Sequence, residues 1–282
     1  MLPIDFLPSS TEQRIIFWDD FSLGQLDRSK WNVKTTGKTH NNEQQAYVDS
    51  TETIYILPER EVPGATNGVL VIHPRYRPGF KTPEGKQFDF VSGRIDTNEK
   101  FDFKYGSTAV RMKLPSGSGL WPAFWALGKG KWPASGEIDI MEYVGEPDWV
   151  SAALHGPGYC GESGLVNKKF FSGSQDATDW HVYSVDWLPD RLTFKVDGET
   201  VYRVTRPMVK FFGPWVFDDH KYLILNFALG GTYPFKTNGE QIPYYGLPEP
   251  TAQKIKENQV KIIVDWVKIK GFTNSYKTQT NL

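Results

Sequence analysis

The sequence predicts an all-β protein in which two antiparallel sheets pack face to face as a β-sandwich or jelly roll. Short runs of alternating apolar and polar residues recur along the chain, and clusters of Gly, Pro, Asn and Asp separate them. Helical periodicity is scarce, and strands do not alternate with helices as they would in a parallel sheet. Many short strands without crossover helices are typical of sandwiches and jelly rolls.

Six segments carry the strand pattern most clearly, in the order 68–72, 108–114, 182–187, 192–196, 222–228 and 260–269. Turn residues punctuate the chain at 115–117, 197–198, 230–231 and 238–239. Residues 191–204 are predicted to form a hairpin, because Asp197 and Gly198 suit a two-residue turn. Only residues 251–257 have a helical pattern, and we expect one short helix there.

One domain accounts for most of the 282 residues, because no linker, repeat or low-complexity tract interrupts the pattern. We expect a lead segment at residues 1–14, a core domain at 15–271 and a frayed polar tail at 272–282. The start of the chain is broken by Pro and lacks a basic region, so it is not an intact secretory signal peptide.

Composition narrows the choice of partners. The net charge of -1 is spread along the chain, which argues against nucleic acid or an acidic membrane surface as a partner. No apolar run approaches the roughly 20 residues that a membrane-spanning helix needs. Cys160 is the only cysteine, which excludes an intrachain disulfide and a zinc site built on thiolates. The 10 Trp are numerous, and exposed indoles are flat surfaces on which sugar rings stack.

The function is indicated by three acids within six residues of a predicted strand. Alternation puts Glu137 and Asp139 on one face of that strand but sends Glu142 to the apolar face. A buried, unpaired carboxylate costs several kcal/mol or changes its protonation state. A β-bulge at about Met141 would return Glu142 to the face of the other two acids. The sequence therefore predicts a row of three carboxyl groups on one open face of a sheet.

Two carboxyl groups on one face suit the cleavage of a glycosidic bond. A separation of about 5 to 5.5 Å indicates a retaining enzyme, and about 6.5 to 9.5 Å indicates an inverting one. We favour retention, with Glu142 holding a proton as the acid, Glu137 attacking the anomeric carbon, and Asp139 tuning both. Two alternatives remain at this point, because an acidic strand edge can simply be solvated and a carboxylate row can bind Ca²⁺.

Residues 136–142 resemble the signature of glycoside hydrolase family sixteen, in the branch with the bulged E-x-D-x-x-E motif that contains laminarinases, agarases and carrageenases. Further segments are similar to the laminarinase branch, at 15–21, 41–47, 103–106, 119–125, 155–159, 180–183 and 264–267. The resemblance implies a concanavalin-like jelly roll with a concave substrate cleft, and makes residues 15–271 its catalytic domain. It also implies an endo-acting β-1,3-glucanase.

The resemblance implies roles for individual residues. Glu137 becomes the nucleophile, Asp139 its assistant and Glu142 the acid/base. The implied substrate-binding residues are Trp121, Trp125, Trp132, Asn42, Glu43, Arg94 and His155. The tryptophans could instead be core residues, but we expect Trp132 to be exposed. We expect His155 to lie beside Glu142. A surface ion pair is an equal alternative for Arg94, and Asn42 and Glu43 could be ordinary turn residues.

The resemblance also implies a structural Ca²⁺ on the convex side, away from the cleft. Its ligands would be the Asp265 side chain and main-chain oxygens near Asp20 and Gly68. Asp265 could instead be an ordinary charged residue of an edge strand. We expect no cofactor for catalysis, a β-glucan polysaccharide as the partner, a monomer, and an extracellular location with the signal peptide absent from this sequence.

The leading interpretation is a retaining endo-β-1,3-glucanase that also accepts mixed β-1,3/1,4-glucan. Three alternatives stay open: a galactan hydrolase (agarase or carrageenase), a β-glucan transglycosylase on the same site, and a non-catalytic lectin on the same jelly roll. The chain departs from the family pattern at 105–111, which lacks an Arg and a Glu, and at 241–248, which resembles an insertion. These departures bear on the choice of polysaccharide rather than on the reaction.

Overall fold

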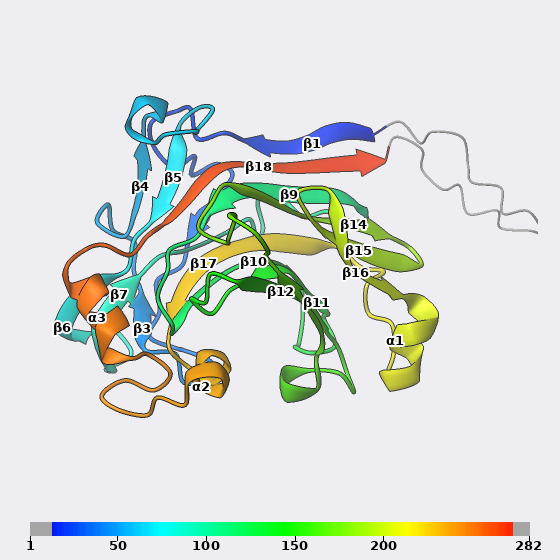
Figure 1. Cartoon of the computed structure of the whole chain (residues 1–282). Coiled ribbons are helices and arrows are strands. Elements are labelled where there is room, and N and C mark those ends of the chain that lie inside the picture. Colours follow the sequence, from blue (N-terminus) through cyan, green and yellow to red (C-terminus); the bar gives the residue numbers. More distant parts are fainter. Residues whose placement is uncertain (1–12, 273–282) are drawn as a thin grey trace, which may run out of the picture.

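The computed structural model describes residues 13–272. Two large antiparallel sheets stack on each other and curve in the same direction, so that the molecule has a convex and a concave face (Figure 1). The predicted all-β sandwich is therefore confirmed. The predicted lead and tail segments lie outside the described residues except at positions 13, 14 and 272, so the domain boundaries stay predictions.

The convex sheet has eight strands. Seven of them follow the order β16 (Glu199–Thr205), β15 (Arg191–Val196), β14 (His181–Leu188), β9 (Gly106–Lys113), β18 (Ile262–Phe272), β5 (Val69–Ile72) and β4 (Ile54–Leu57), and β1 (Gln13–Asp19) pairs with β18 outside this path.

The concave sheet has seven strands. Their order is β13 (Leu165–Phe170), β12 (Trp149–His155), β11 (Glu137–Glu142), β10 (Leu120–Gly128), β17 (Lys221–Leu229), β8 (Arg94–Asp96) and β2 (Asn32–Val33). The acidic strand β11 is thus an inner strand of this sheet, with neighbours on both sides that can contribute to a site.

A small third sheet and short helices complete the fold. The sheet consists of β3 (Gln45–Tyr47), β7 (Gln87–Ser92) and β6 (Arg75–Lys81). The helices are α1 (Arg206–Phe212), α2 (Thr232–Asn238) and α3 (Glu249–Lys256), with 3₁₀ turns η1 (Glu59–Glu61) and η2 (Gly161–Ser163). α1 and α2 lie at two sides of the concave face, and α3 lies beside the third sheet (Figure 1).

The six predicted strands, the hairpin and the one predicted helix are all present. Asp197 and Gly198 close the hairpin between β15 and β16 with φ angles of 51° and 82°, as a two-residue turn of this kind requires. The sequence did not indicate α1 and α2. Each has only seven residues and contains a Pro, so neither carries a readable helical period.

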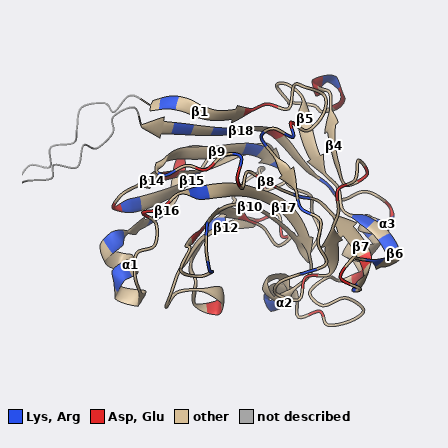
Figure 2. Cartoon of the chain, turned by 180° about the vertical axis from the view of Figure 1, so that it is seen from behind, with Lys and Arg blue, Asp and Glu red and all other residues tan. Residues whose placement is uncertain are grey.

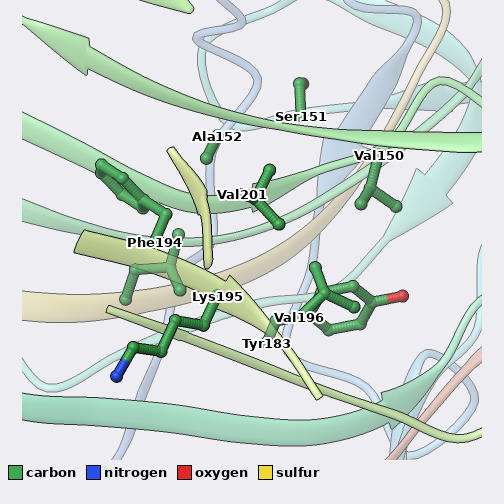
Figure 3. A pocket seen from close by; sticks show the side chains of 9 residues that line it. Val150, Ser151, Ala152, Tyr183, Phe194, Lys195, Val196 and Val201 are labelled. Carbon is green, nitrogen blue, oxygen red and sulfur yellow. The ribbon is translucent and has the colours of Figure 1, made fainter. Parts of the chain in front are cut away.

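The core fills the space between the two large sheets. Figure 3 shows apolar side chains from β12, β14, β15 and β16 that converge there, among them Val150, Ala152, Tyr183 and Phe194. The cavity that they line measures only about 10 Å³, about the space of one water molecule. This tight packing holds the concave sheet in shape, so that its open face can keep a fixed geometry.

Charged residues of both signs are distributed along the elements. Lys and Arg are interspersed with Asp and Glu over the elements (Figure 2). None of the helices within residues 13–272 is long and apolar enough to cross a bilayer.

Candidate active site

A β-bulge brings the three predicted acids onto one face of β11. Between Asp139 and Glu142 the strand has two residues, Ile140 and Met141, where the paired strand β12 has one. The side chains of Ile140 and Met141 are both buried in the core. The extra residue returns Glu142 to the side of Asp139 and Glu137, and the bulge predicted at about Met141 is confirmed.

The three carboxyl groups are poorly hydrated and close enough to influence one another. Burial raises the pKa of Asp139 to about 8. Burial and then the charge of Asp139 raise the pKa values of Glu137 and Glu142 to about 8, while His155 opposes both shifts. Because these groups compete for protons, at least one of them holds a proton at neutral pH. A proton donor beside an ionised carboxylate is the arrangement that acid-assisted bond cleavage needs.

Each glutamate accepts a hydrogen bond from a tryptophan. Trp132 Nε1 donates to Glu137 Oε2 over 3.1 Å, and Trp121 Nε1 donates to Glu142 Oε1 over 3.1 Å. Trp132 is 44% exposed, which confirms the prediction for this ring, and Trp121 is half-buried on β10. Both rings therefore lie where a sugar bound at the acids would touch them.

His155 lies in direct contact with Glu137 and Asp139, and it also opposes the rise in the pKa of Glu142, the neighbour that the sequence predicted. It is directly opposite Glu137 in the ladder between β11 and β12. Its Nε2 is 3.3 Å from Asp139 Oδ2 and 3.8 Å from Glu137 Oε1. Gly164 makes room for the ring, since a Cβ there would be 2.3 Å from His155 Cε1. The register of the two strands decides this neighbour, and a sequence does not give the register across a loop.

Trp125, Arg94 and Glu43 form a second group on the other side of the acid row. Trp125 on β10 lies opposite Asp139. The Arg94 guanidinium carbon is 5.1 Å from the centroid of the Trp125 ring, so this arginine stacks on a tryptophan of the site. Glu43 is half-buried, and burial raises its pKa while Gln45 and Arg94 oppose the shift.

Asn42 lies in the loop before β3, with a positive φ of 58° and an exposed side chain. Its main-chain oxygen accepts a hydrogen bond from Gln44 Nε2. The loop lies close to the site. Gly231 shows this, since a Cβ there would touch both the backbone of Glu43 and the ring of Trp121. Asn42 therefore belongs to the same region as Glu43.

A hydrogen-bond network that sequence reasoning missed supports this second group. Asn226 on β17 accepts from Trp125 Nε1 over 2.7 Å and donates to the Tyr47 hydroxyl over 3.0 Å. Gln45 Nε2 donates to Glu43 Oε2 over 2.9 Å. Asn226 was detectable, because it is the one amide side chain in the apolar run 222–228. Gln45 and Tyr47 carried no such signal.

Tyr233 is a further neighbour of the acid row that the sequence did not indicate. Its hydroxyl is 2.9 Å from Ser151 Oγ, and Ser151 pairs with Glu142 across the ladder. Its ring meets Trp121 edge-on at 5.7 Å. It comes from α2, a helix without a readable sequence pattern.

The residues proposed for Ca²⁺ do not fit that ion in the observed arrangement. Asp265 is fully buried; its Oδ1 accepts from the Thr66 amide over 2.8 Å, and its Oδ2 accepts from the Thr66 hydroxyl and from Arg111 Nη1 over 2.9 and 2.5 Å. Gly68 does lie against the main chain that follows Asp20. The arginine already balances the carboxylate charge, so we derive no role for calcium.

A different set of atoms has a spacing suited to a metal ion. Glu137, Asp139 and His155 each offer one ligand atom, and these atoms lie within 4.8 Å of one another. The same atoms form the acid row, so a metal there would compete with the acid and nucleophile roles.

Residues 29–221 match the family model of glycosyl hydrolases family 16. The chain belongs to this family. The acid row on β11 lies within the matched region.

Proteins of known activity resemble this family 16 chain over most of its length. Glucan endo-1,3-beta-glucosidase A1 of Niallia circulans is 34% identical over 253 residues, which cover 80% of this chain and 35% of the relative. A beta-glucanase of Rhodothermus marinus is 32% identical over 247 residues, which cover 83% of this chain and 81% of the relative. The structure of the endo-beta-1,3-glucanase from Pyrococcus furiosus matches with a TM-score of 0.79 at 32% identity. The match covers 93% of this chain and 96% of that structure. The chain thus spans about a third of the first relative.

Proposed function

We propose that this chain is an endo-acting, retaining hydrolase of β-1,3-glucan, including mixed β-1,3/1,4-glucan. The arrangement that carries the proposal is the bulged strand, because it gives one partly buried row both an acid and a nucleophile. The names of the relatives support the choice of glucan. Because a glucan polymer is too large to cross a cell membrane, we place the reaction outside the cell.

In the first step the glycosidic bond breaks with help from both glutamates. Glu142, which burial keeps protonated, donates its proton to the leaving oxygen. Glu137 attacks the anomeric carbon, and a covalent glycosyl ester forms. Trp132 donates to Oε2 of Glu137 and so holds the carboxylate in one orientation. His155 lies against the other oxygen, Oε1.

In the second step water releases the sugar. Once Glu137 is esterified, its negative charge is gone and the pKa of Glu142 falls. Glu142 then accepts a proton from the water that attacks the ester, and both carboxyl groups return to their starting state. In the free enzyme Asp139 raises the pKa values of both glutamates, which is how an assisting acid in the middle of the row would act.

The tryptophans of β10 and of the loop that follows it give the site its affinity for a chain of sugars. Trp121 and Trp132 flank the acids, and Trp125 with Arg94 continues the surface toward β8. A surface that extends beyond the point of cleavage binds several units of a polymer at once. This favours cleavage inside a chain over removal of its end unit.

The test is a digest of laminarin, lichenan, agarose and carrageenan, with the product anomers followed by proton NMR. We expect release from laminarin and lichenan and early β-anomer. Early α-anomer would overturn retention, and cleavage of agarose or carrageenan instead of glucan would overturn the substrate. E137A should abolish release while E59A, at an exposed glutamate of η1, should not. A wild-type rate in E137A would refute the catalytic assignment.

A further inference from the structure

Lys221, the first residue of β17, is a fully buried lysine that the mechanism above does not use. Its side chain is 0% exposed. Its Nζ donates to two main-chain oxygens, Ser135 O over 2.9 Å and Val216 O over 3.2 Å. Burying an ammonium group is costly, and bonding to carbonyl oxygens offsets only part of that cost. A chain that retains such a group without a need for it would be less stable than one with an apolar residue.

Two glycines form the chamber around the ammonium group. A Cβ at Gly128 would be 3.2 Å from Lys221 Nζ and 1.9 Å from Ser135 O. A Cβ at Gly136, which has a φ of 70°, would be 3.0 Å from the same Nζ. The backbone closes around the group as well, since the Gly128 amide donates to Gly136 O over 3.0 Å. The rings of Trp187 and Phe217 lie 5.8 and 5.6 Å from Nζ.

The chamber lies at the base of the loop that builds half of the active site. Residues 129–136 connect β10 to β11 and carry Trp132, and Glu137 follows directly. The carbonyl that Lys221 binds belongs to Ser135, two residues before Glu137. The loop has a few internal hydrogen bonds of its own, such as Ser135 N to Lys131 O over 3.1 Å. Strand pairing holds the ends of the loop, with Leu127 opposite Glu137, and the ammonium group adds a side-chain link from β17 to its base.

We propose that Lys221 is a positioning residue that fixes the Trp132 loop and the nucleophile Glu137 by binding the Ser135 carbonyl from beneath. The residue touches neither the substrate nor the reacting atoms. It ties the loop to Val216 on the opposite side of the chamber, so that both segments keep one arrangement. Burial also lowers the pKa of Lys221 to about 8, which fits a cation held by neutral partners.

The test rests on the proposed function and compares K221M with K129M. Methionine keeps the length of the side chain and removes the donor. Lys129 is the matched control, because it belongs to the same loop but forms an exposed ion pair with Asp102 over 2.6 Å. The substrates are a laminarin oligosaccharide and an aryl β-glucoside of the same glycone whose leaving group needs no acid. An epoxide inactivator bearing that glycone labels Glu137.

For K221M we expect kcat/KM to fall about 10- to 100-fold on both substrates, since displacing a nucleophile by up to about 1 Å can cost about 100-fold. The extent of labelling should stay complete while its rate falls. K129M should stay within about 2-fold of wild type. A purely structural role would lower the extent of labelling instead, and would refute the proposal. So would an unchanged kcat/KM, or a loss confined to the substrate that needs the acid.

Two controls keep the outcome interpretable. If the wild-type enzyme hydrolyses neither substrate, the proposed function fails. The lack of activity then says nothing against a positioning role for Lys221. If K221M does not fold, ¹⁵N-lysine NMR of the wild-type enzyme replaces it. The Lys221 ammonium signal should shift when the inactivator traps Glu137, because the two are linked through Ser135. A signal that does not move would overturn the proposal.

Discussion

Replacing Glu142 with Gln should stabilise the protein, and the gain should grow as the pH rises. Burial and the charge of Asp139 raise the pKa of Glu142 from 4.5 to about 8. Between these two values the unfolded chain releases the proton while the folded chain keeps it. The folded state therefore loses stability as the pH rises through this window, and the loss is complete above about pH 8. An amide at this position escapes the penalty because it has no charge to desolvate.

The size of the gain follows from the pKa. A rise from 4.5 to about 8, at about 1.4 kcal/mol per unit, sets an upper limit of roughly 5 kcal/mol for the free energy of unfolding. The measured gain should be smaller, because part of the rise comes from the charge of Asp139, and burial keeps Asp139 itself largely protonated below about pH 8. We expect about 1 to 3 kcal/mol at pH 8 and close to zero at pH 4.5. The amide oxygen can still accept the hydrogen bond from Trp121.

The assay is urea unfolding of wild type, E142Q and E59Q at several pH values from 4.5 to 8. E59Q makes the same chemical change at an exposed residue of η1, so its curve should follow that of wild type. The E142Q curve should separate from both as the pH rises. If the three curves run parallel, the carboxyl group of Glu142 is not held in its protonated form by the fold. The acid role would then lose its physical basis.

Three further outcomes are expected. W132F keeps a flat ring but removes the donor to Glu137, so kcat should fall about 10-fold or more with little change in KM, and equal kcat values would contradict this. G164A forces the imidazole of His155 aside and should cost about 1 to 3 kcal/mol in urea unfolding as well as activity; an unchanged midpoint would count against it. Dialysis against EGTA should leave Tm and activity unchanged, and a loss restored by Ca²⁺ would show that the chain does bind the ion.

The sequence predicted the sandwich and the bulge because both rest on local rules. Alternating polarity gives the strands, and paired turn residues such as Asp197 and Gly198 give the hairpin. The bulge follows from one energy argument, since Glu142 on the apolar face would be buried without a partner. That argument needs no knowledge of the neighbouring strands.

What the sequence could not give depends on contacts between distant segments. The neighbours of His155 follow from the register between β11 and β12. That register cannot be predicted from the sequence of the loop that joins the two strands. The partners of Asp265 come from residues 66 and 111, far from it in the chain. Tyr233 reaches the site from a seven-residue helix whose pattern is too short to read.

Lys221 and His155 near Glu137 illustrate why distant contacts matter to the chemistry. A cation bonded directly to Glu137 would lower the pKa of that carboxyl group and stabilise its charge. A carboxylate stabilised in this way is a weaker nucleophile. Lys221 instead binds the carbonyl of Ser135, so it can hold the strand in place without an ion pair to the nucleophile. His155, within 4 Å of both Asp139 and Glu137, opposes the rise in the pKa of Glu137, and so does the hydrogen bond from Trp132. Position and charge at the nucleophile are thus set by different residues, and substitutions at Lys221 and His155 should separate the two.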